Sequence, residues 1–448
     1  MSIYTEEQAR EICEKVVKLS KADECVVNFN GGTAGNIRYA LNEVSTSGIV
    51  DDANLVVQVA YGKKVGIATT NVFDDAALAA VVRRAEELAK LAPENPEFMP
   101  AIEKQTYTAT RTLNEATAKI TPEYRAQVAA DCIEPCRKEN LVAAGFFTDN
   151  NNFTATANSN GNFGYARSAD MDFTCTVRTA DDQGSGWVAR NLADVTQFDA
   201  KKDIRTAIDK AKKSVDAKAL EPGKYTVVLE PAAASGLVSF MLFGFDARQA
   251  DEGRSFMTKK GGGNRIGEKV FDERVTMYSD PADVNVPALP WDGDGLPRER
   301  TPIISKGVVD YLYYSRYWAK QKEKEAIPLP GNIIMVGGDK TTDELVKSTK
   351  RGVLVTRTWY IRLVDPQTML LTGLTRDGTF YIENGEIKHP VKNFRFNESP
   401  VIMLNNIEEL GKPERIDAQG GVGGGGFVMM VPPMKIRDFT FTSLSDAV

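Results

Sequence analysis

The chain has 448 residues, which is too long for one ordinary hydrophobic core and predicts two or three domains. Its composition, with 42% hydrophobic and 26% charged residues, excludes the disordered and fibrous classes of protein. The formal net charge of −6 gives no general electrostatic reason to bind phosphates, so a nucleic-acid partner is not expected.

The location of the protein is predicted from three features of the sequence. No stretch approaches the roughly 20 apolar residues of a membrane-spanning helix. The first residues lack the basic start and apolar run of a secretory signal. The five cysteines are an odd number in a long chain, which favours reduced thiols over a disulfide scaffold. We therefore expect a cytoplasmic protein without a membrane partner.

Residues 1–95 have the pattern of a helix, antiparallel strands and a second helix. The first helix begins at Thr5, which has the spacing of a capping box with Gln8. Alternating segments separated by turns over 24–71 predict antiparallel strands. Asp74 or Asp75 then begins the second helix.

The same order recurs over residues 120–218. Thr121 and Pro122 begin a helix, strand-like segments cover 141–192, and Asp199 begins a last helix. Turns are expected at 149–152 and 158–161. We therefore predict an N-terminal domain over 1–220 that is built from two helix–strands–helix repeats, at about 1–95 and 120–218.

From residue 221 to residue 448 strand signals predominate, so a mostly β C-terminal domain is expected and the fold class is α+β. Asp377-Gly378 and Asn384-Gly385 are turn dipeptides that flank 379–383, which predicts at least one hairpin. Further strands are expected at 226–229, 427–431 and 439–441, and short helices at 231–243 and 341–347.

Two glycine-rich segments are candidates for ligand binding. Glycines beside cations in Lys259–Arg265 can cradle a phosphate, but the segment lacks the strand-to-helix context of a P-loop, so a surface loop is favoured. Gln419–Gly426 includes Gly420, Gly421 and Gly423, which allow close backbone approach. It is either a wall along which an extended ligand passes or a tightly curved connection before the last strands.

Paired acidic and cysteine side chains offer weaker signals. Asp292 with Asp294, and Glu383 with Glu386, could perform acid–base chemistry, but turn-like sequence favours solvated turn residues. Cys132 and Cys136 could share a helix face, although Pro135 is expected to end that helix. Core packing is favoured over a metal site, because these cysteines have no histidine partner.

Arg357, Trp359, Tyr360 and Arg362 combine cationic and aromatic groups that could hold a peptide or carboxylate, or simply pack at an interface. His389 is the single histidine of the chain and is expected to be an exposed residue at the end of a strand. Catalytic zinc sites and Ser-His-Asp or Cys-His machinery usually need histidine beside other ligands or a nucleophile, so neither is favoured.

Many short segments, taken together in order, resemble the TldD/PmbA family, once labelled modulators of DNA gyrase. The resembling segments are Gly253–Phe256, Asn264–Val270, Val275–Met277 with Asp280-Pro281, Asp292–Pro297 with Arg298 and Arg300, Val364–Pro366, Tyr381–Ile387 with Pro390-Val391, and Pro433–Ile436. The duplicated first half resembles the family layout as well. The resemblance therefore covers most of the chain.

Active members of this family resemble zinc peptidases with a His-Glu-x-x-x-His helix and a later cysteine ligand. The resemblance places the two histidine positions at Ser239 and Gly244, and the glutamate position at Phe240. The cysteine position falls within 418–421, which contains Gly420 and Gly421. Because these side chains cannot bind zinc or act as a base, no catalytic residue, metal or cofactor is expected. Ser239, Phe240, Gly244, Gly420, Gly421 and Gly423 are instead hypothesised to contact substrate.

The resemblance implies a metal-free, PmbA (TldE)-like subunit that forms part of a peptide-binding chamber for proteolysis of unfolded or extended peptides. Its expected partner is a zinc-bearing TldD-type paralogue or a second copy of itself, in a dimer. One alternative is a stand-alone hydrolase with Ser239 as nucleophile and a lysine base. Another is a regulator of DNA gyrase, against which the acidic net charge argues.

Overall fold

The computed structural model of the chain describes residues 3–417 and 428–445. In the first half the elements are, in chain order, α1 (Glu6–Leu19), β1 (Glu24–Ala40), β2 (Glu43–Tyr61), β3 (Lys64–Thr70), α2 (Asp75–Leu91), the 3-10 turn η1 (Thr117–Lys119), α3 (Pro122–Lys138), β4 (Leu141–Asn158), β5 (Phe163–Thr179), β6 (Ser185–Leu192), η2 (Val195–Gln197) and α4 (Ala200–Lys213). The predicted order of helix, strands and helix is present twice, with three strands in each copy.

In the second half strands predominate. The elements are β7 (Gly223–Leu229), α5 (Pro231–Leu242), α6 (Ala247–Asp251), β8 (Met277–Ser279), β9 (Thr301–Ser305), β10 (Val308–Val309), α7 (Arg316–Gln321), β11 (Asn332–Met335), α8 (Thr342–Lys347), β12 (Arg351–Asp365), β13 (Leu370–Glu383), β14 (Glu386–Pro390), β15 (Phe394–Glu398), α9 (Pro400–Asn405), β16 (Ile407–Leu410), β17 (Glu414–Asp417), β18 (Val428–Val431) and β19 (Met434–Leu444). The α+β class is therefore confirmed. None of the helices described has the length and hydropathy to cross a bilayer.

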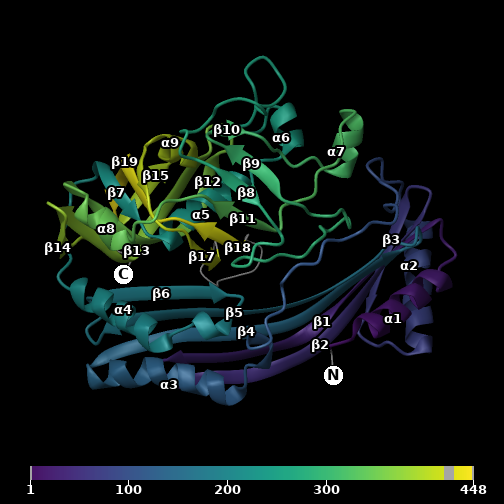
Figure 1. Ribbon diagram of the computed structural model, residues 1–448, viewed down its shortest axis with the longest axis horizontal. Coiled ribbons are helices and arrows are strands. Elements are labelled where there is room, and N and C mark those ends of the chain that lie inside the picture. Colours follow the sequence, from purple (N-terminus) through teal and green to yellow (C-terminus); the bar gives the residue numbers. More distant parts are fainter. Residues whose placement is uncertain (1–2, 418–427, 446–448) are drawn as a thin grey trace.

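The first half forms one antiparallel sheet in the order β3-β2-β1-β4-β5-β6. The first strands of the two repeats, β1 and β4, are neighbours at its centre, with Val27 opposite Ala157. The four helices α1 to α4 cover one face of this sheet, and the second half of the chain lies over the other face (Figure 1). Because side chains alternate between faces along a strand, the apolar residues of one face form two clusters, one beneath α1 and α2 and the other beneath α3 and α4. Each cluster includes residues of both long central strands, β1 and β4.

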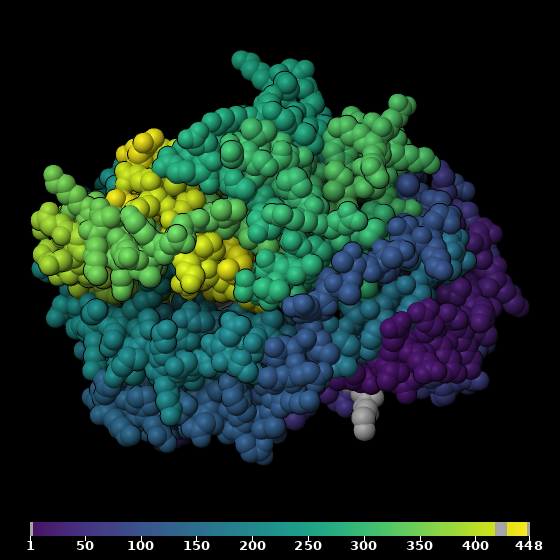
Figure 2. Space-filling view, viewed as in Figure 1, coloured from purple at the N-terminus to yellow at the C-terminus, as the bar shows by residue number. Residues whose placement is uncertain are grey.

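The second half contains two further sheets. One has the order β10-β9-β8-β11-β18-β17. In the other, β12 pairs with both β7 and β13, so that β12-β7-β19-β15-β13 close into a ring. The largest core cluster lies among these sheets and helix α5. In Figure 2 the green and yellow atoms of this half rest directly on the teal and blue atoms of the first half. The division into domains at about residue 220 falls between α4 and β7 and stays a prediction.

Three predictions about turns and helix ends were wrong, two of them because pairing between strands outweighs a local signal. Residues 149–152 are not a turn but the middle of β4, where they pair with both β1 and β5. Asp377-Gly378 lies within β13, opposite a register shift of β12, whereas Asn384-Gly385 does form the β13–β14 hairpin turn. Pro135 does not end its helix: α3 continues past it to Lys138.

Candidate functional site

Helix α5 carries the positions where the resemblance places lost zinc ligands. It follows β7 directly, with Pro231 at its first turn, where a missing N–H does no harm. The helix is apolar almost all round, so it is buried against β12, β17, β18 and α9. The hydroxyl of Thr358 on β12 donates to the carbonyl of Ala233 at 3.1 Å and fixes the helix to the closed ring of strands.

Ser239 and Phe240 lie in the last turn of α5. Ser239 is only 3% exposed, so its hydroxyl is not presented to a substrate in this conformation. Phe240 is half-buried, and its ring lies 6.2 Å from that of Phe243, edge to face. These side chains build an apolar helix end, which has no ligand for a zinc ion.

Gly244 follows the end of α5, and its surroundings leave no room for a larger side chain. A Cβ atom there would lie 2.6 Å from Cε1 of Phe256 and 2.8 Å from Cε of Met369. The Ser255 hydroxyl donates to the Gly244 carbonyl at 2.8 Å and holds the Phe256 segment against it. The position of the second histidine in the resemblance is therefore filled by the side chains of Phe256 and Met369.

The strands next to the glycine run lie beside α5. β17 and β18 pair antiparallel, with Asp417 opposite Val428, and both strands contact the helix. Asp417 and Val428, the described residues on either side of the glycine run, therefore end two strands that contact α5. Gly420, Gly421 and Gly423 lie outside the described residues, so their hypothesised contact with substrate stays a prediction.

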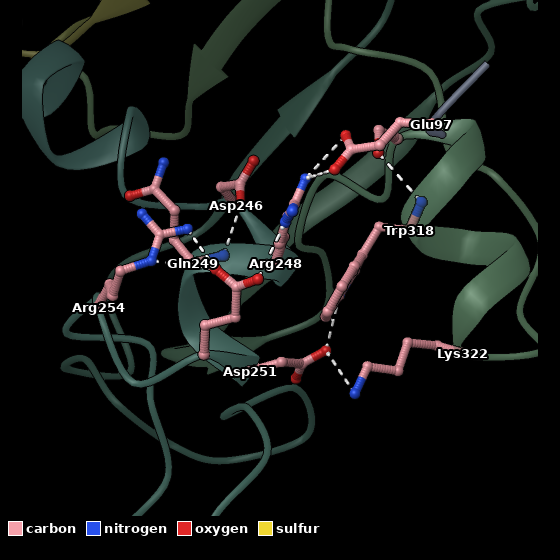
Figure 3. Close-up of polar contacts among 10 residues, drawn as sticks. Glu97, Asp246, Arg248, Gln249, Asp251, Arg254, Trp318 and Lys322 are labelled. Atoms are coloured by element: carbon pink, nitrogen blue, oxygen red, sulfur yellow. Dashed lines mark hydrogen bonds and ion pairs between the residues drawn. The ribbon is translucent and has the colours of Figure 1, made fainter. Parts of the chain in front are cut away.

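The acidic side chains that follow Gly244 are engaged in pairing (Figure 3). Arg248 on α6 forms ion pairs with Glu97, at 2.9 Å, and with Glu252, at 3.0 Å. Asp251 accepts a hydrogen bond from Nε1 of Trp318 on α7 at 2.9 Å, and Lys322 lies nearby. These contacts attach α6 to α7 and to the segment that contains Glu97. Across residues 3–417 and 428–445, no group of three or more His, Cys, Asp or Glu side chains is placed to hold a metal ion.

A groove of about 510 Å³ lies between the two halves, at the N-terminal end of α5. Its walls come from β6, α4, α8 and β17, and β17 is the last strand of its sheet in the described part of the chain. Lys210 and Glu230 form an ion pair of 2.7 Å across the groove, between α4 and the N-cap of α5. A strand at the edge of its sheet, beside a groove, can bind an extended peptide through backbone hydrogen bonds.

Four charged side chains of the groove, those of Arg190, Lys210, Glu230 and Arg415, are half-buried. Burial lowers the pKa of Arg415 from its ordinary value, while Asp170 and Asp172 oppose this shift. Arg415 also donates to Oδ1 of Asn191 at 2.7 Å, which links β17 to β6. Arg190, which lines the groove, donates at 3.1 Å to Asp203, which does not, and burial raises the pKa of Asp203 in spite of this bond. The groove was missed in the sequence because its walls come from segments more than 200 residues apart.

The other sequence candidates have structural roles. Lys259 and Arg265 both pair with Glu268 beside the exposed glycine turn, so these two cations are engaged within the chain. Asp292 was expected to be solvated but is buried, and it accepts hydrogen bonds from the backbone N–H groups of Asp294 and Leu296 at 3.0 Å. Neither segment has the geometry of a catalytic or phosphate site.

Arg357 packs at the junction between the two halves. Its guanidinium lies 4.4 Å from the ring centre of Trp187 on β6 and forms an ion pair with buried Asp377. Asp377 also accepts a hydrogen bond from Ser185 at 2.6 Å. Arg357 also lies 5.0 Å from the ring centre of Trp359, so the interface-packing interpretation fits both side chains. Tyr360 adopts a positive φ of 54° and is exposed, with Arg362 over its ring.

The described geometry does not support catalysis by a cysteine thiolate or by the histidine. All five cysteines are buried, and burial raises the pKa of the Cys13 and Cys136 thiols to about 12, so the reactive thiolate is disfavoured. His389 is half-buried on β14, where its ring stacks on Tyr381 and its Nδ1 lies 3.0 Å from the Pro390 carbonyl.

Comparison with known proteins identifies the family. The model of the PmbA/TldA metallopeptidase C-terminal domain matches residues 222–443, and the model of domain 1 of the same family matches residues 25–89. Together these matches cover more than half of the chain. The chain belongs to the TldD/PmbA family.

Full-length relatives share the architecture of this TldD/PmbA member. Metalloprotease PmbA of Escherichia coli O157:H7 is 22% identical, over 96% of this chain and 97% of its own length. The crystal structure of TldE from Thermococcus kodakarensis has a TM-score of 0.85 at 17% identity and covers 97% of this chain and 100% of its own. A proposed modulator of DNA gyrase from Bacteroides thetaiotaomicron has a TM-score of 0.83 at 18% identity, over 99% and 100% of the two chains. These structural matches establish the shared fold.

Proposed function

We propose that this chain is the metal-free subunit of a cytoplasmic TldD/PmbA-type metalloprotease system and forms part of a chamber that binds unfolded or extended peptides. The observation that carries the proposal is the packing of Gly244 against Phe256 and Met369, which fills the place of a ligand with apolar side chains. Ser239 and Phe240 supply neither a zinc ligand nor a general base. The subunit would therefore depend on a partner for catalysis.

The partner in this proposal is a zinc-bearing TldD-type paralogue or a second copy of the chain. The role left to this chain is binding, and the groove beside β17 is the surface that fits an extended peptide. Its strand edge offers backbone groups to a ligand of any sequence, which suits substrates that share only an unfolded backbone.

The test combines the pure chain with its zinc-bearing paralogue and measures hydrolysis of a reduced, carboxymethylated polypeptide. We expect no turnover by the chain alone and more turnover by the mixture than by the paralogue alone. Turnover by the pure chain, or no gain on mixing, would contradict the proposal.

A matched pair of variants on α4 tests the groove itself. Thr206 is exposed and lines the groove, whereas Lys201 is exposed on the same helix but does not line it. We expect Thr206→Trp to raise the KM of the mixture several-fold by occupying the groove, with Lys201→Trp unchanged. Equal KM values for the two variants would exclude this groove as the peptide site.

The two alternative functions have less support. A stand-alone hydrolase needs an accessible nucleophile, and the Ser239 hydroxyl is buried in the described structure. Regulation of DNA gyrase is suggested by the old family label and by two structural relatives of 17–18% identity that carry it, and the net charge of −6 argues against contact with DNA.

A further inference from the structure

A pocket lies between the two halves of the molecule, over the strands of the first repeat. Its volume of about 540 Å³ falls within the range of roughly 300–1,000 Å³ that small-molecule sites usually have. The sheet contributes residues of β1, β2, β3 and β4, and further lining residues come from the segment 95–102. The second half contributes 293–295 and 315–317. The pocket is therefore complete only when the two halves are packed together.

Three polar side chains on the sheet side of the pocket are not hydrogen-bonded to any described residue. Asn28 and Thr156 lie opposite each other on β1 and β4, and Gln58 lies on β2. The next residues on β1 and β4, Phe29 and Ala157, lie in the core beneath the helices, so Asn28 and Thr156 point to the opposite face. Thr156 is only 6% exposed, and a buried hydroxyl normally has a partner. These groups therefore indicate a ligand that brings donors and acceptors of its own.

One carboxylate of the pocket also has no partner among the described residues. Glu24 accepts a hydrogen bond from the N–H of Ala101 at 3.0 Å, and Glu97 forms an ion pair with Arg248 at 2.9 Å. The Asp294 carboxylate, by contrast, forms no hydrogen bond and no ion pair within the described structure. Its charge is therefore available to a cationic group of a ligand.

The turn that carries Asp294 is held in place by hydrogen bonds. Asp292 is buried and accepts from the N–H of Asp294 at 3.0 Å. The Tyr107 hydroxyl donates to the carbonyl of Gly295 at 2.7 Å, and the Asn162 amide donates to that hydroxyl at 2.7 Å. The position of Asp294 is therefore fixed before a ligand binds, which reduces the entropy lost on binding.

A cationic side chain lines the same pocket. Arg316 begins α7, and one of its terminal nitrogens donates to the carbonyl of Pro100. Partial desolvation and the charge of Asp292 raise the pKa of Asp294, and the Arg316 guanidinium is close enough to oppose this rise. The two side chains nevertheless form no ion pair with each other. A carboxylate and a guanidinium that share a pocket without pairing suit a ligand that carries both charges.

We propose that this pocket binds a dipeptide with both ends free, its α-ammonium group at Asp294 and its α-carboxylate at Arg316. An arginine offers parallel N–H donors in the geometry that a carboxylate accepts. The peptide bond of the ligand has one donor and one acceptor, which the amides of Asn28 and Gln58 can match. A single amino acid has no peptide bond and would leave these amides unpaired. Phe98 also lines the pocket and offers apolar surface to a side chain of the ligand.

Isothermal titration calorimetry of the full chain with glycyl-leucine tests the site, and it needs neither a partner subunit nor hydrolysis. We expect a dissociation constant of about 1 mM or below. N-acetyl-glycyl-leucine, glycyl-leucine amide and free leucine each lack one of the groups that the pocket would bind, so each should bind at least about tenfold more weakly. These comparisons use the wild type and do not depend on the folding of a variant. No binding at about 10 mM, or equal affinity for any of the three analogues, would overturn the proposal.

Two pairs of variants test whether the dipeptide binds in this pocket. Asp294→Asn and Arg316→Gln each remove one of the two charges and should weaken the binding of glycyl-leucine at least about tenfold. Asp339→Asn and Arg84→Gln make the same changes at exposed positions outside the pocket and should leave the affinity unchanged. Thr206→Trp, in the groove beside β17, should also leave it unchanged, so this proposal and the proposed function can fail separately. Full affinity in Asp294→Asn, or loss of binding in Thr206→Trp, would overturn the assignment to this pocket.

Discussion

Gly244 occupies a place in the fold where a single added carbon has no room. Its neighbours are the ring of Phe256, which lies in the core, and the end of the Met369 side chain. Gly244→Ala should therefore lower the free energy of unfolding by about 1–3 kcal/mol, the usual effect of overpacking. Urea denaturation measures this, with Gly293→Ala as the control because open space surrounds that glycine. Equal stability of the two variants would show that the pocket around Gly244 is loose.

Asp377 joins the two halves of the molecule through its charge. It is buried and bonded to Ser185 of β6 and to Arg357 of β12. Asp377→Asn keeps the shape and tolerates the φ of 54°, but leaves the buried guanidinium without its counter-charge. We expect a loss of about 3–5 kcal/mol in the free energy of unfolding.

The matched control for this substitution is Asp182→Asn. Asp182 also has a positive φ, of 57°, but its carboxylate is exposed and pairs only loosely with Arg178. That variant should remain within about 0.5 kcal/mol of the wild type. A similar loss in both variants would mean that the left-handed backbone, and not the buried charge, sets the stability.

At the scale of elements, Glu139 couples α3 to α4. Its carboxylate accepts from Arg205 at 2.8 Å and from Lys212, and these bonds lower its pKa to about 2. Because the folded pKa lies below the unfolded value of about 4.3, the pairs stabilise the fold fully above that value. Their contribution is lost as the pH falls toward 2.

The variant Glu139→Gln should therefore be less stable than the wild type at pH 7, by less than about 1 kcal/mol per pair for such exposed groups. The difference should shrink between pH 4 and pH 2 and vanish below pH 2. Urea unfolding across this range measures it. A difference that is constant with pH would mean that the amide disturbs packing and that charge has no part in the effect.

Elements were predictable from the sequence where local chemistry decides them. The capping box of Thr5 and Gln8 and the cap at Asp74 begin α1 and α2 as expected. Predictions failed where pairing with strands distant in the sequence decides the local conformation. The asparagines of 149–152 favour a turn locally, but strands on both sides hold them extended. Asp377-Gly378 bends a strand for the same reason.

For the whole molecule, the duplication and the α+β class could be predicted because each repeat is a local run of elements. The strands of the two repeats run outward in chain order from the central β1–β4 pair of one sheet. The groove could not be predicted, since β6 and β17 are brought together only by the packing of the two halves. Likewise, no sequence pattern reports that Phe256 and Met369 fill the space beside Gly244.

The claim that this family member has lost the zinc chemistry is tested most directly by the metal content and peptidase activity of the pure full-length chain. The protein would be purified, dialysed against zinc, freed of loosely bound metal and assayed on a reduced, carboxymethylated polypeptide. We predict zinc far below one ion per chain and no turnover, because Ser239, Phe240 and Gly244 offer no ligand or base. One tightly bound zinc per chain together with turnover would contradict this account.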